Sequence, residues 1–394
     1  MATANSAVQE STAHAGRRGE ARRERAHSGI VGIVAVFQGL MFASHWFVYE
    51  TLQLFFSPLN PAVHLALAIG FAVLSLSFMG TSLLAFRYNN FPLRMLYRVA
   101  AVWLGVFSYF FFASLLTWAV HALVLASLLK ASSWWIAFVL FSFAIALSIW
   151  GVLNANWVRI RKIRVKLANL PEVWRGRTAV LASDLHLGHL HYRGFSARIV
   201  RKISALRPDV IFLAGDIFDG TYVNAPEVVA PFRFLRAPLG AFFVTGNHEL
   251  FRGESQYLEA IRKVGIRDLQ NEKVELDGLQ VAGVPYHHAT HAEHFRSVLV
   301  KIAVDPGRAS VLLTHAPDQP AITAEAGLGL QLSGHTHLGQ FFPFSWIARR
   351  IYGPFTYGLS RLGDTQFYVS SGAGTWGPPL RIGSQAEIVQ ISFE

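Results

Sequence analysis

The sequence contains no cysteine among its 394 residues. This absence excludes disulfides, cysteine-based zinc sites, iron–sulfur clusters and thiol nucleophiles. Charged residues make up 15% of the chain, whereas apolar residues make up 52% and the mean hydropathy is +0.35, which is high for a soluble globular protein. The apolar excess lies mainly in residues 29–157, so the two halves of the chain are different kinds of protein.

The formal net charge is +11 and the isoelectric point is near 10.1, which invites a nucleic-acid interpretation. Much of the basic excess, however, lies beside apolar stretches, where membrane topology and anionic lipid headgroups explain it better. Nucleic acid is therefore not the expected partner. The residues concerned are Arg17, Arg18, Arg22, Arg23, Arg25, Arg87, Arg94, Arg98, Arg159, Arg161, Lys162, Arg164 and Lys166.

Residues 1–28 are polar and rich in Ala and Arg, without periodic apolar positions. This composition predicts a disordered basic tail. A secretory signal peptide is the alternative, but no small-residue cleavage site followed by a polar mature chain is present.

Four long apolar stretches follow the tail, and each reaches the roughly 20 residues needed to cross a hydrocarbon core. They predict a transmembrane region of four helices over residues 29–157, with spans near 29–55, 61–86, 97–129 and 133–157. The tail, the second connector and the segment after the fourth span are rich in Arg, whereas the other two connectors carry only Lys130. The positive-inside rule then predicts an integral protein of the inner or plasma membrane, with both termini and the catalytic half in the cytoplasm.

Three polar residues lie within these spans: His45, Glu50 and His121. A transport or proton path would need such residues. The set is sparse, so hydrogen bonds between helices and snorkelling at span ends are the favoured interpretation.

From residue 158 onward, short apolar runs alternate with helix-like segments, which predicts an α/β domain over residues 158–394. Three consecutive polar motifs, at Asp184, Asp216 and Asn247, lie just over thirty residues apart, the length of a strand–helix–strand unit. Parallel strands deliver their carboxyl-terminal loops to one edge, where ligands bind in open α/β sheets. The runs expected as strands are 179–183, 210–214, 241–245, 279–284, 310–313, 331–333 and 366–369.

Five polar motifs follow apolar runs in this half. They are Asp184-Leu185-His186, Gly215-Asp216-Ile217-Phe218-Asp219, Gly246-Asn247-His248-Glu249, Thr314-His315 and Gly334-His335-Thr336-His337. Together they supply enough Asp, Asn and His side chains to hold two metal ions side by side, an arrangement that breaks phosphate esters. A mixed nitrogen and oxygen set without sulfur suits Mn²⁺, Fe²⁺, Zn²⁺ or Co²⁺.

The order of these motifs resembles the calcineurin-like metallophosphoesterase superfamily over roughly residues 175–394. The resemblance implies two mixed sheets packed face to face and flanked by helices. It implies a first metal held by Asp184, His186, Asp216 and His337, and a second held by Asp216, Asn247, His315 and His335. His248 and the shared Asp216 would be the catalytic residues, with Glu249 placed to orient His248.

Two departures separate the chain from sister families. The Arg that follows the second Asp in Ser/Thr protein phosphatases is absent after Asp219, and Asp219 replaces the Tyr of purple acid phosphatases. The segments 334–340, 358–361 and 371–378 look like the membrane-associated bacterial branch. Some members of that branch are similar to UDP-2,3-diacylglucosamine hydrolase-type phosphodiesterases.

Several further features have two interpretations. The segment 341–350 can form an apolar lip that dips into the membrane interface, or a buried helix on the sheet. His189 and His191 can touch substrate. A second group of histidines has no place in the family pattern and is expected at the surface or in the core: His287, His288, His291 and His294.

The expected function is a membrane-anchored, two-metal phosphoesterase that uses metal-bound hydroxide to cleave a phosphodiester or pyrophosphate bond. The substrate is expected to be lipid-linked, because a protein with four spans should meet its substrate in the bilayer. One alternative is a nucleotide or polynucleotide phosphodiesterase that is merely tethered to the membrane. Another is a non-catalytic transporter or sensor.

Overall fold

A computed structural model describes residues 32–57, 60–127 and 132–394. The predicted tail over residues 1–28 lies outside the described residues, as do the first positions of the first span and parts of the first and third connectors, including Lys130.

Four helices are long and apolar enough to cross a membrane, as the sequence predicts. They are Gly32–Phe56, α2 (Pro61–Ala85), α3 (Phe91–Ala126) and α4 (Ser133–Asn156). The third helix begins six residues before the predicted span, because Asn90 caps it: its Oδ1 accepts the Leu93 amide at 2.9 Å. The first turns of α3 therefore carry Arg94 and Arg98.

The chain divides into two compact units, and α3 and α4 each contribute to both. The first unit contains the residues up to 80 together with 110–141. Its helices are joined by polar contacts: Trp118 Nε1 donates to Thr51 Oγ1 at 3.1 Å, and Ser133 Oγ lies 2.8 Å from His121 Nδ1. His121 thus forms a hydrogen bond between helices, in line with the favoured interpretation of the polar residues in the spans.

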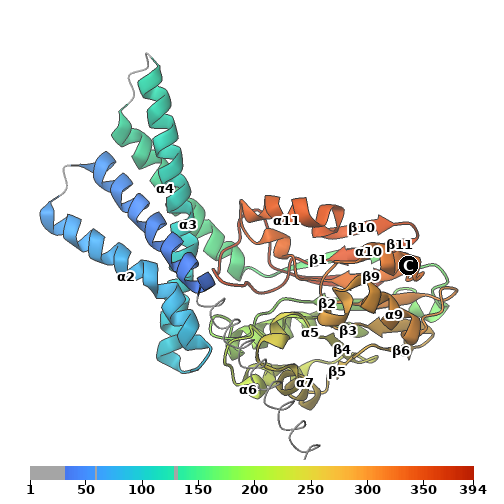
Figure 1. The fold of residues 1–394 in the computed structure, drawn as a ribbon. Helices are drawn as coiled ribbons and strands as arrows, with labels where there is room; N and C mark the ends of the chain where they lie inside the picture. The colour runs from blue at the N-terminus through green and yellow to red at the C-terminus, as the bar shows by residue number, and fades with distance from the viewer. Residues whose placement is uncertain (1–31, 58–59, 128–131) are drawn as a thin grey trace, which may run out of the picture. The chain divides into compact units, whose positions relative to one another are not determined.

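The second unit contains residues 81–109 and 142–394, and its C-terminal half is built on two six-stranded sheets (Figure 1). The first sheet has the order β1-β12-β2-β3-β4-β5 and the second β10-β11-β9-β8-β7-β6. Both sheets are mixed. In the first sheet β12 pairs antiparallel with β2 and all other neighbouring pairs are parallel, whereas in the second sheet the two outermost pairs are antiparallel and the centre is parallel. The strands are β1 (Arg159–Val165), β2 (Thr178–Ala182), β3 (Val210–Ala214), β4 (Ala241–Val244), β5 (Arg267–Asp268), β6 (Glu272–Leu276), β7 (Leu279–Gly283), β8 (Ser310–Leu313), β9 (Leu330–Ser333), β10 (Gly358–Leu362), β11 (Thr365–Val369) and β12 (Glu387–Phe393).

The sheets pack face to face around an apolar core to which both contribute, for example Phe212 and Leu313. A second core lies between the outer face of the first sheet and its helices, and a third lies between the second sheet and its helices. The predicted sandwich flanked by helices is confirmed. The helices are α5 (Arg193–Ala205), α6 (Ala225–Val229), α7 (Glu254–Lys263), α8 (Tyr286–Ala289), α9 (Ala292–Ile302), α10 (Pro320–Glu325) and α11 (Phe344–Tyr352).

Within the second unit, α3 and α4 approach a loop of the C-terminal half very closely. A Cβ at Gly151 of α4 would lie 2.7 Å from Leu380, and one at Gly105 of α3 would lie 3.2 Å from Pro378. Asn154 donates to the carbonyls of Arg381 and Ser384 at 2.8 and 3.0 Å. These glycines let the helix backbones pack directly against the loop.

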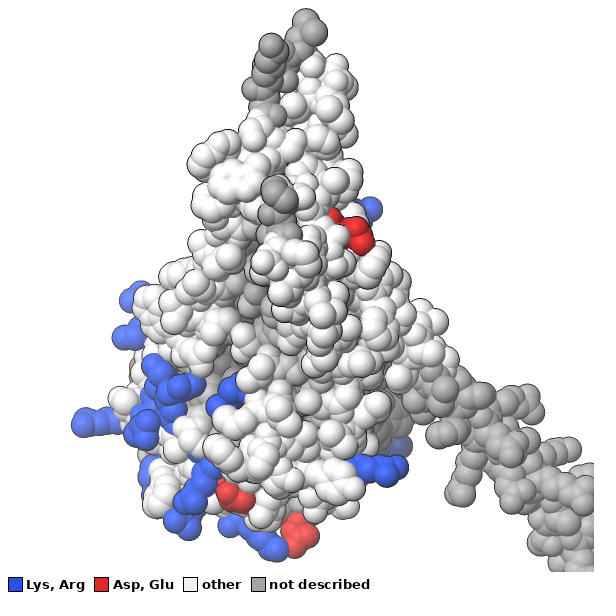
Figure 2. All heavy atoms as spheres, turned by 90° about the vertical axis from the view of Figure 1, so that its left-hand side faces the viewer, with Lys and Arg blue, Asp and Glu red and all other residues white. Residues whose placement is uncertain are grey.

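The helices and the C-terminal half differ in surface charge. On the face shown in Figure 2, Lys and Arg gather over the C-terminal half, while the helices present an almost uncharged surface. An uncharged helical surface of this kind is suited to lipid rather than water.

Candidate metal centre

All eight predicted site residues gather where strands of both sheets end. Asp184 and His186 follow β2, Asp216 follows β3, and Asn247 and His248 follow β4. From the second sheet, His315 follows β8, and His335 and His337 follow β9. The two sheets thus face their ligand-bearing loops toward one place, as expected for the carboxyl ends of parallel strands.

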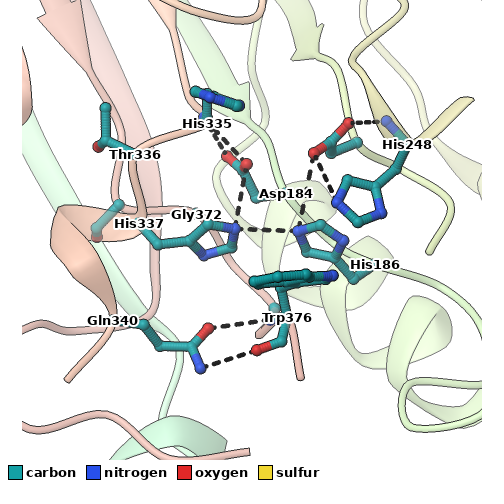
Figure 3. Close-up of polar contacts among 12 residues, drawn as sticks. Asp184, His186, His248, His335, Thr336, His337, Gln340, Gly372 and Trp376 are labelled. Atoms are coloured by element: carbon teal, nitrogen blue, oxygen red, sulfur yellow. Dashed lines mark hydrogen bonds and ion pairs between the residues drawn. The ribbon is translucent and has the colours of Figure 1, made fainter. Parts of the chain in front are cut away.

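The first group of potential ligands is Asp184, His186 and His337, all buried (Figure 3). The Nε2 atoms of His186 and His337 lie 3.0 Å apart, and His337 Nε2 lies 3.4 Å from Asp184 Oδ1. Two imidazole nitrogens and a carboxylate oxygen therefore point into one small volume.

The second group is Asp216, His315 and His335. His315 Nε2 lies 3.1 Å from Asp216 Oδ2 and 3.3 Å from His335 Nδ1. Asn247 joins this group, since its Oδ1 lies 3.0 Å from the same nitrogen of His335. Asp216 Oδ2 also lies 4.0 Å from His186 Nε2 of the first group, so this carboxylate lies between the two groups.

The backbone is strained where these side chains are presented. Asp184, His186, Asp216, His335 and His337 all have positive φ, between 48° and 72°. A non-glycine residue in this region costs about 1–3 kcal/mol, and such residues persist where the surrounding structure enforces them. Their concentration at one site indicates a functional constraint on the direction of each side chain.

Two glycines make room for the carboxylates. A Cβ at Gly246 would lie 2.1 Å from Asp216 Oδ1, and one at Gly334 would lie 2.2 Å from Asp184 Oδ2. Any side chain at either position would displace a carboxylate. The glycines in the Gly-Asn-His and Gly-His-x-His motifs are therefore part of the site's geometry.

His248 lies at the edge of the centre and faces both groups. Its Nδ1 lies 2.9 Å from the Asp219 carbonyl and can donate to it, while its Nε2 lies 3.9 Å from Asp216 Oδ2. Its backbone amide donates to Asp216 Oδ1 at 2.9 Å. His248 thus presents a ring nitrogen beside the Asp216 carboxylate.

Glu249 does not orient His248, so the expectation for this residue was wrong. Its buried carboxylate accepts the backbone amides of Asp216, Phe218 and Gly246 at 3.0, 3.0 and 2.6 Å. Glu249 therefore fixes the two loops against each other, because it ties the Asp216 loop to the loop that carries Asn247.

Burial and close charges shift the pKa values of the site. Burial raises the pKa of Asp184 to about 6. Burial opposes ionisation of Asp216 as well, but the adjacent His315 holds the pKa of Asp216 well below its usual range. Burial lowers and the Asp216 carboxylate raises the pKa of His315, to a net value of about 10. In the metal-free protein the Asp216 carboxylate thus favours protonation of His315, and a cation that binds His315 competes with that proton.

The residues fit divalent cations. Within the described part of the chain, His186 Nδ1 is buried without a hydrogen-bond partner. Its Nε2 faces the equivalent nitrogen of His337, and only one proton can lie between two neutral imidazoles. Converging lone pairs, neighbouring carboxylates and an amide oxygen are the donor set of a mixed nitrogen–oxygen metal site.

Two supporting residues are not evident from the sequence. Arg381 is fully buried and donates through Nη2 to the carbonyls of Ser371 and Gly374 at 2.6 and 2.7 Å, and the same nitrogen lies 3.3 Å from His337 Nδ1. Gln340 pairs with the backbone of Trp376, accepting its amide at 2.9 Å and donating to its carbonyl at 3.0 Å (Figure 3). A lone arginine in a Gly/Pro-rich loop is the only local signal for Arg381.

Trp376 is held firmly yet remains 59% exposed, and its ring centroid lies 5.9 Å from that of His248. A large apolar ring fixed beside the centre is placed to contact a substrate.

The remaining histidines do not join the centre. His189 is buried between Thr221 and the Tyr88 carbonyl, and His191 contacts Thr375 at 2.9 Å, so neither points at the two ligand groups. The rings of His287 and His288 are tilted by 51° with their centroids 3.9 Å apart, and the His294 ring centroid lies 4.6 Å from that of His288. No metal-binding group among the described residues includes these three or His291.

Comparison with known proteins places this geometry in context. Residues 178–339 match the family described as calcineurin-like phosphoesterase. The chain is 31% identical over 258 residues to an uncharacterized metallophosphoesterase of Aquifex aeolicus and covers 97% of it.

Two longer relatives also match. An uncharacterized metallophosphoesterase of Campylobacter jejuni is 28% identical over 350 residues, covering 88% of this chain and 82% of that protein. A bovine transmembrane protein with metallophosphoesterase domain is 34% identical over 269 residues, covering 63% of this chain. The chain spans only 60% of the length of the bovine protein.

Proposed function

The chain belongs to the calcineurin-like metallophosphoesterase family and is a metal-dependent phosphoesterase; on this premise we propose that it holds two divalent cations and hydrolyses a lipid-linked phosphodiester or pyrophosphate at the cytoplasmic membrane face. The supporting observation is the position of Asp216, whose Oδ2 lies 3.1 Å from His315 Nε2 and 4.0 Å from His186 Nε2, so that it can join ligand-type side chains on either side. A carboxylate so placed can serve both cations at once.

The ligands divide as the family resemblance implies. Asp184, His186, Asp216 and His337 would hold one cation, and Asp216, Asn247, His315 and His335 the other. When bound, such a pair supplies a water of lowered pKa and neutralises charge on the phosphoryl oxygens. Mn²⁺, Fe²⁺, Zn²⁺ and Co²⁺ all suit the donor set.

The protein's own residues do the rest. His248 is positioned to give a proton to the leaving oxygen, since its Nε2 faces the centre while Nδ1 is fixed by the Asp219 carbonyl. Glu249 and Arg381 hold the loops that carry the ligands, and burial of the ligand groups excludes bulk water. Trp376 would contact the apolar part of the substrate.

The apolar helices support the proposed substrate class. Residues 29–157 would form the transmembrane region and residues 158–394 the catalytic domain. Within one compact unit, the loops around Gln340 and Arg381 pack against α3 and α4, so the site is built on membrane helices rather than joined to them by a linker. The Arg-rich segments at 87–98 and 159–166 support a cytoplasmic catalytic half.

The test compares hydrolysis of bis-p-nitrophenyl phosphate, p-nitrophenyl phosphate and lipid-linked diesters or pyrophosphates by the purified full chain with Mn²⁺. Asn247→Ala should lower metal content and turnover together. His248→Ala should keep its metal and lose about a hundredfold or more in kcat.

Each alternative has its own outcome. Full activity on soluble nucleotides with none on lipids would reject the lipid-linked substrate in favour of a tethered nucleotide phosphodiesterase. Bound metal without turnover on any ester would point to a sensor instead.

A further inference from the structure

Helix α11 (Phe344–Tyr352) presents three different faces. Residues three or four positions apart share a helix face. Ser345, Ala348 and Tyr352 form the inward face: Ala348 is buried, the other two are half-buried, and the Ala348 carbonyl lies 3.4 Å from Thr356 Oγ1. This face attaches the helix to the rest of the domain, which leaves the other two free for a partner.

The second face is apolar and exposed. Phe344, Ile347 and Ile351 are 48%, 42% and 69% exposed, and the preceding Phe342 is 57% exposed. Contiguous apolar side chains of this size rarely face water on a soluble protein, so the face marks an interaction surface.

The third face combines two cations with an aromatic ring. Arg349 and Arg350 are exposed, and Trp346, which lies between them around the helix, is 67% exposed. At 100° per residue, the centre of this face lies well over 90° from that of the apolar face. Arginine beside tryptophan, opposite an apolar strip, is the composition of a helix that lies in the plane of a membrane surface.

Contacts with α3 show how near the helix lies to a transmembrane span. Tyr109 of α3 donates through its hydroxyl to the Phe342 carbonyl at 3.1 Å. Its ring centroid lies 6.3 Å from that of Phe341, which in turn lies 5.1 Å from that of Phe344. Helix α11 therefore begins directly beside Tyr109.

The length of α3 sets the depth of Tyr109. The helix has 36 residues, about 54 Å at 1.5 Å per residue, well beyond a hydrocarbon core of about 30 Å. No Lys, Arg, Asp or Glu occurs between Val99 and Ala126. The roughly 20 residues that cross the core, counted back from Ala126, begin near residue 107. Tyr109 thus lies near the boundary between hydrocarbon and headgroups, where tyrosine is favoured.

We propose that α11 is an interfacial helix that rests on an anionic lipid bilayer, with Phe344, Ile347 and Ile351 among the acyl chains and Arg349 and Arg350 on lipid phosphates. Lipid is the occupant that the contacts favour, because the apolar face continues from a transmembrane helix and its basic residues complement anionic headgroups.

This seat has a consequence for the metal centre. Gln340, four residues before α11, fixes Trp376 beside His248. A bilayer that holds α11 therefore also sets the position of Trp376 at the membrane surface. The placement of Trp376 toward substrate rests on the proposed lipid-linked substrate, whereas the contact of α11 with the bilayer does not.

The absence of cysteine allows a direct test in the full chain. Ile347→Cys is labelled with an environment-sensitive fluorophore, and the protein is placed in nanodiscs of phosphatidylcholine and phosphatidylglycerol. The matched control is Val300→Cys on α9, an aliphatic side chain that is 74% exposed. The expected result is a blue shift at position 347 and loss of its emission when the lipids carry brominated chains, with neither effect at position 300.

Three outcomes would contradict the proposal. Equal water exposure of the two probes would show that α11 does not contact the bilayer. A blue shift at position 347 without quenching by brominated lipid would assign the face to a protein partner or a second copy. Unchanged quenching in the double variant Arg349→Gln, Arg350→Gln would show that the two arginines do not bind the lipid phosphates. Because no readout involves turnover, these outcomes are independent of the proposed catalytic function.

Discussion

The transmembrane helices and the phosphoesterase half place their side chains in opposite ways. In the helices, Leu123 and Leu125 are 69% and 72% exposed. In the phosphoesterase half, the carboxylates of Asp184 and Glu249 are completely buried. Long helices with apolar side chains exposed all round are suited to lipid, and a buried carboxylate needs hydrogen bonds or a cation. The two regions thus suit different surroundings: the exposed apolar helices suit a bilayer, and the buried polar centre suits hydrogen bonds and bound cations.

The largest effect should come from Asp216, which lies between the two ligand groups and which we propose serves both cations. Asp216→Asn should weaken both metals and lower turnover by about a thousandfold, since metal-ion charge stabilisation amounts to several kcal/mol. The matched control is Asp277→Asn, which removes only an exposed ion pair with Arg177. Hydrolysis of bis-p-nitrophenyl phosphate measures both; equal turnover in the two variants would contradict the shared role of Asp216.

Removal of metal should affect one region and not the other. A site occupied at a hundred times its Kd adds about 2.7 kcal/mol of stability. Chelation should therefore speed amide exchange in the loops at 184–188, 216–220, 246–249 and 334–338, while α2 stays unchanged. Amide exchange measured by mass spectrometry in nanodiscs tests this difference. Equal acceleration in both regions would contradict a metal requirement confined to the phosphoesterase half.

Gly334→Ala tests the fit of the first ligand group. Its Cβ would lie 2.2 Å from Asp184 Oδ2, and overpacking of this kind costs about 1–3 kcal/mol. Metal affinity should fall about tenfold to a hundredfold. Gly194→Ala in α5 is the control, because no neighbouring heavy atom lies within 4 Å of its Cβ. Isothermal titration with Mn²⁺ on both variants should separate them.

Gly151→Ala tests whether α4 supports the site. Its Cβ would lie 2.7 Å from Leu380, whereas a Cβ at Gly70 of α2 meets no neighbour within 4 Å. Displacement of the loop from 378 to 382 should cost about 1–2 kcal/mol of stability in the phosphoesterase half. Gly70→Ala should leave the stability of the phosphoesterase half unchanged. If thermal unfolding of the two variants coincides, the packing of α4 on this loop does not support the site.

His294→Ala should have the smallest effect. His294 contacts His288 but lies in no ligand group among the described residues. A surface substitution of this kind changes stability by less than about 0.5 kcal/mol. Metal content and turnover should both match wild type; lost metal would instead reveal a third site.

The sequence predicts the parts of this structure that have local signals. Strands such as β3 and β8 are buried along their whole length, so they read as apolar runs, and the polar residues after them mark the site. The four spans are equally clear from hydropathy. The start of α3 is predicted less well, because the helix extends beyond its apolar stretch through Arg94 and Arg98.

The parts that the sequence does not predict depend on residues far apart in the chain. Strand β1 lies at the sheet edge and mixes basic residues with apolar ones. It pairs with β12, more than 220 residues later. Glu249 accepts the Asp216 amide from 33 residues away, and Arg381 lies against His337 from 44 residues away. Such contacts form only after the two sheets have packed, so no local sequence pattern predicts them.

The most direct test of the central claim is the number of metal ions per chain, measured by elemental mass spectrometry on the full chain in nanodiscs. Two ligand groups that share Asp216 predict two ions per wild-type chain. They also predict loss of both ions in Asp216→Asn, and loss of one in Asn247→Ala. A single ion in the wild-type chain, or two ions retained in Asp216→Asn, would contradict a centre in which one carboxylate serves both metals.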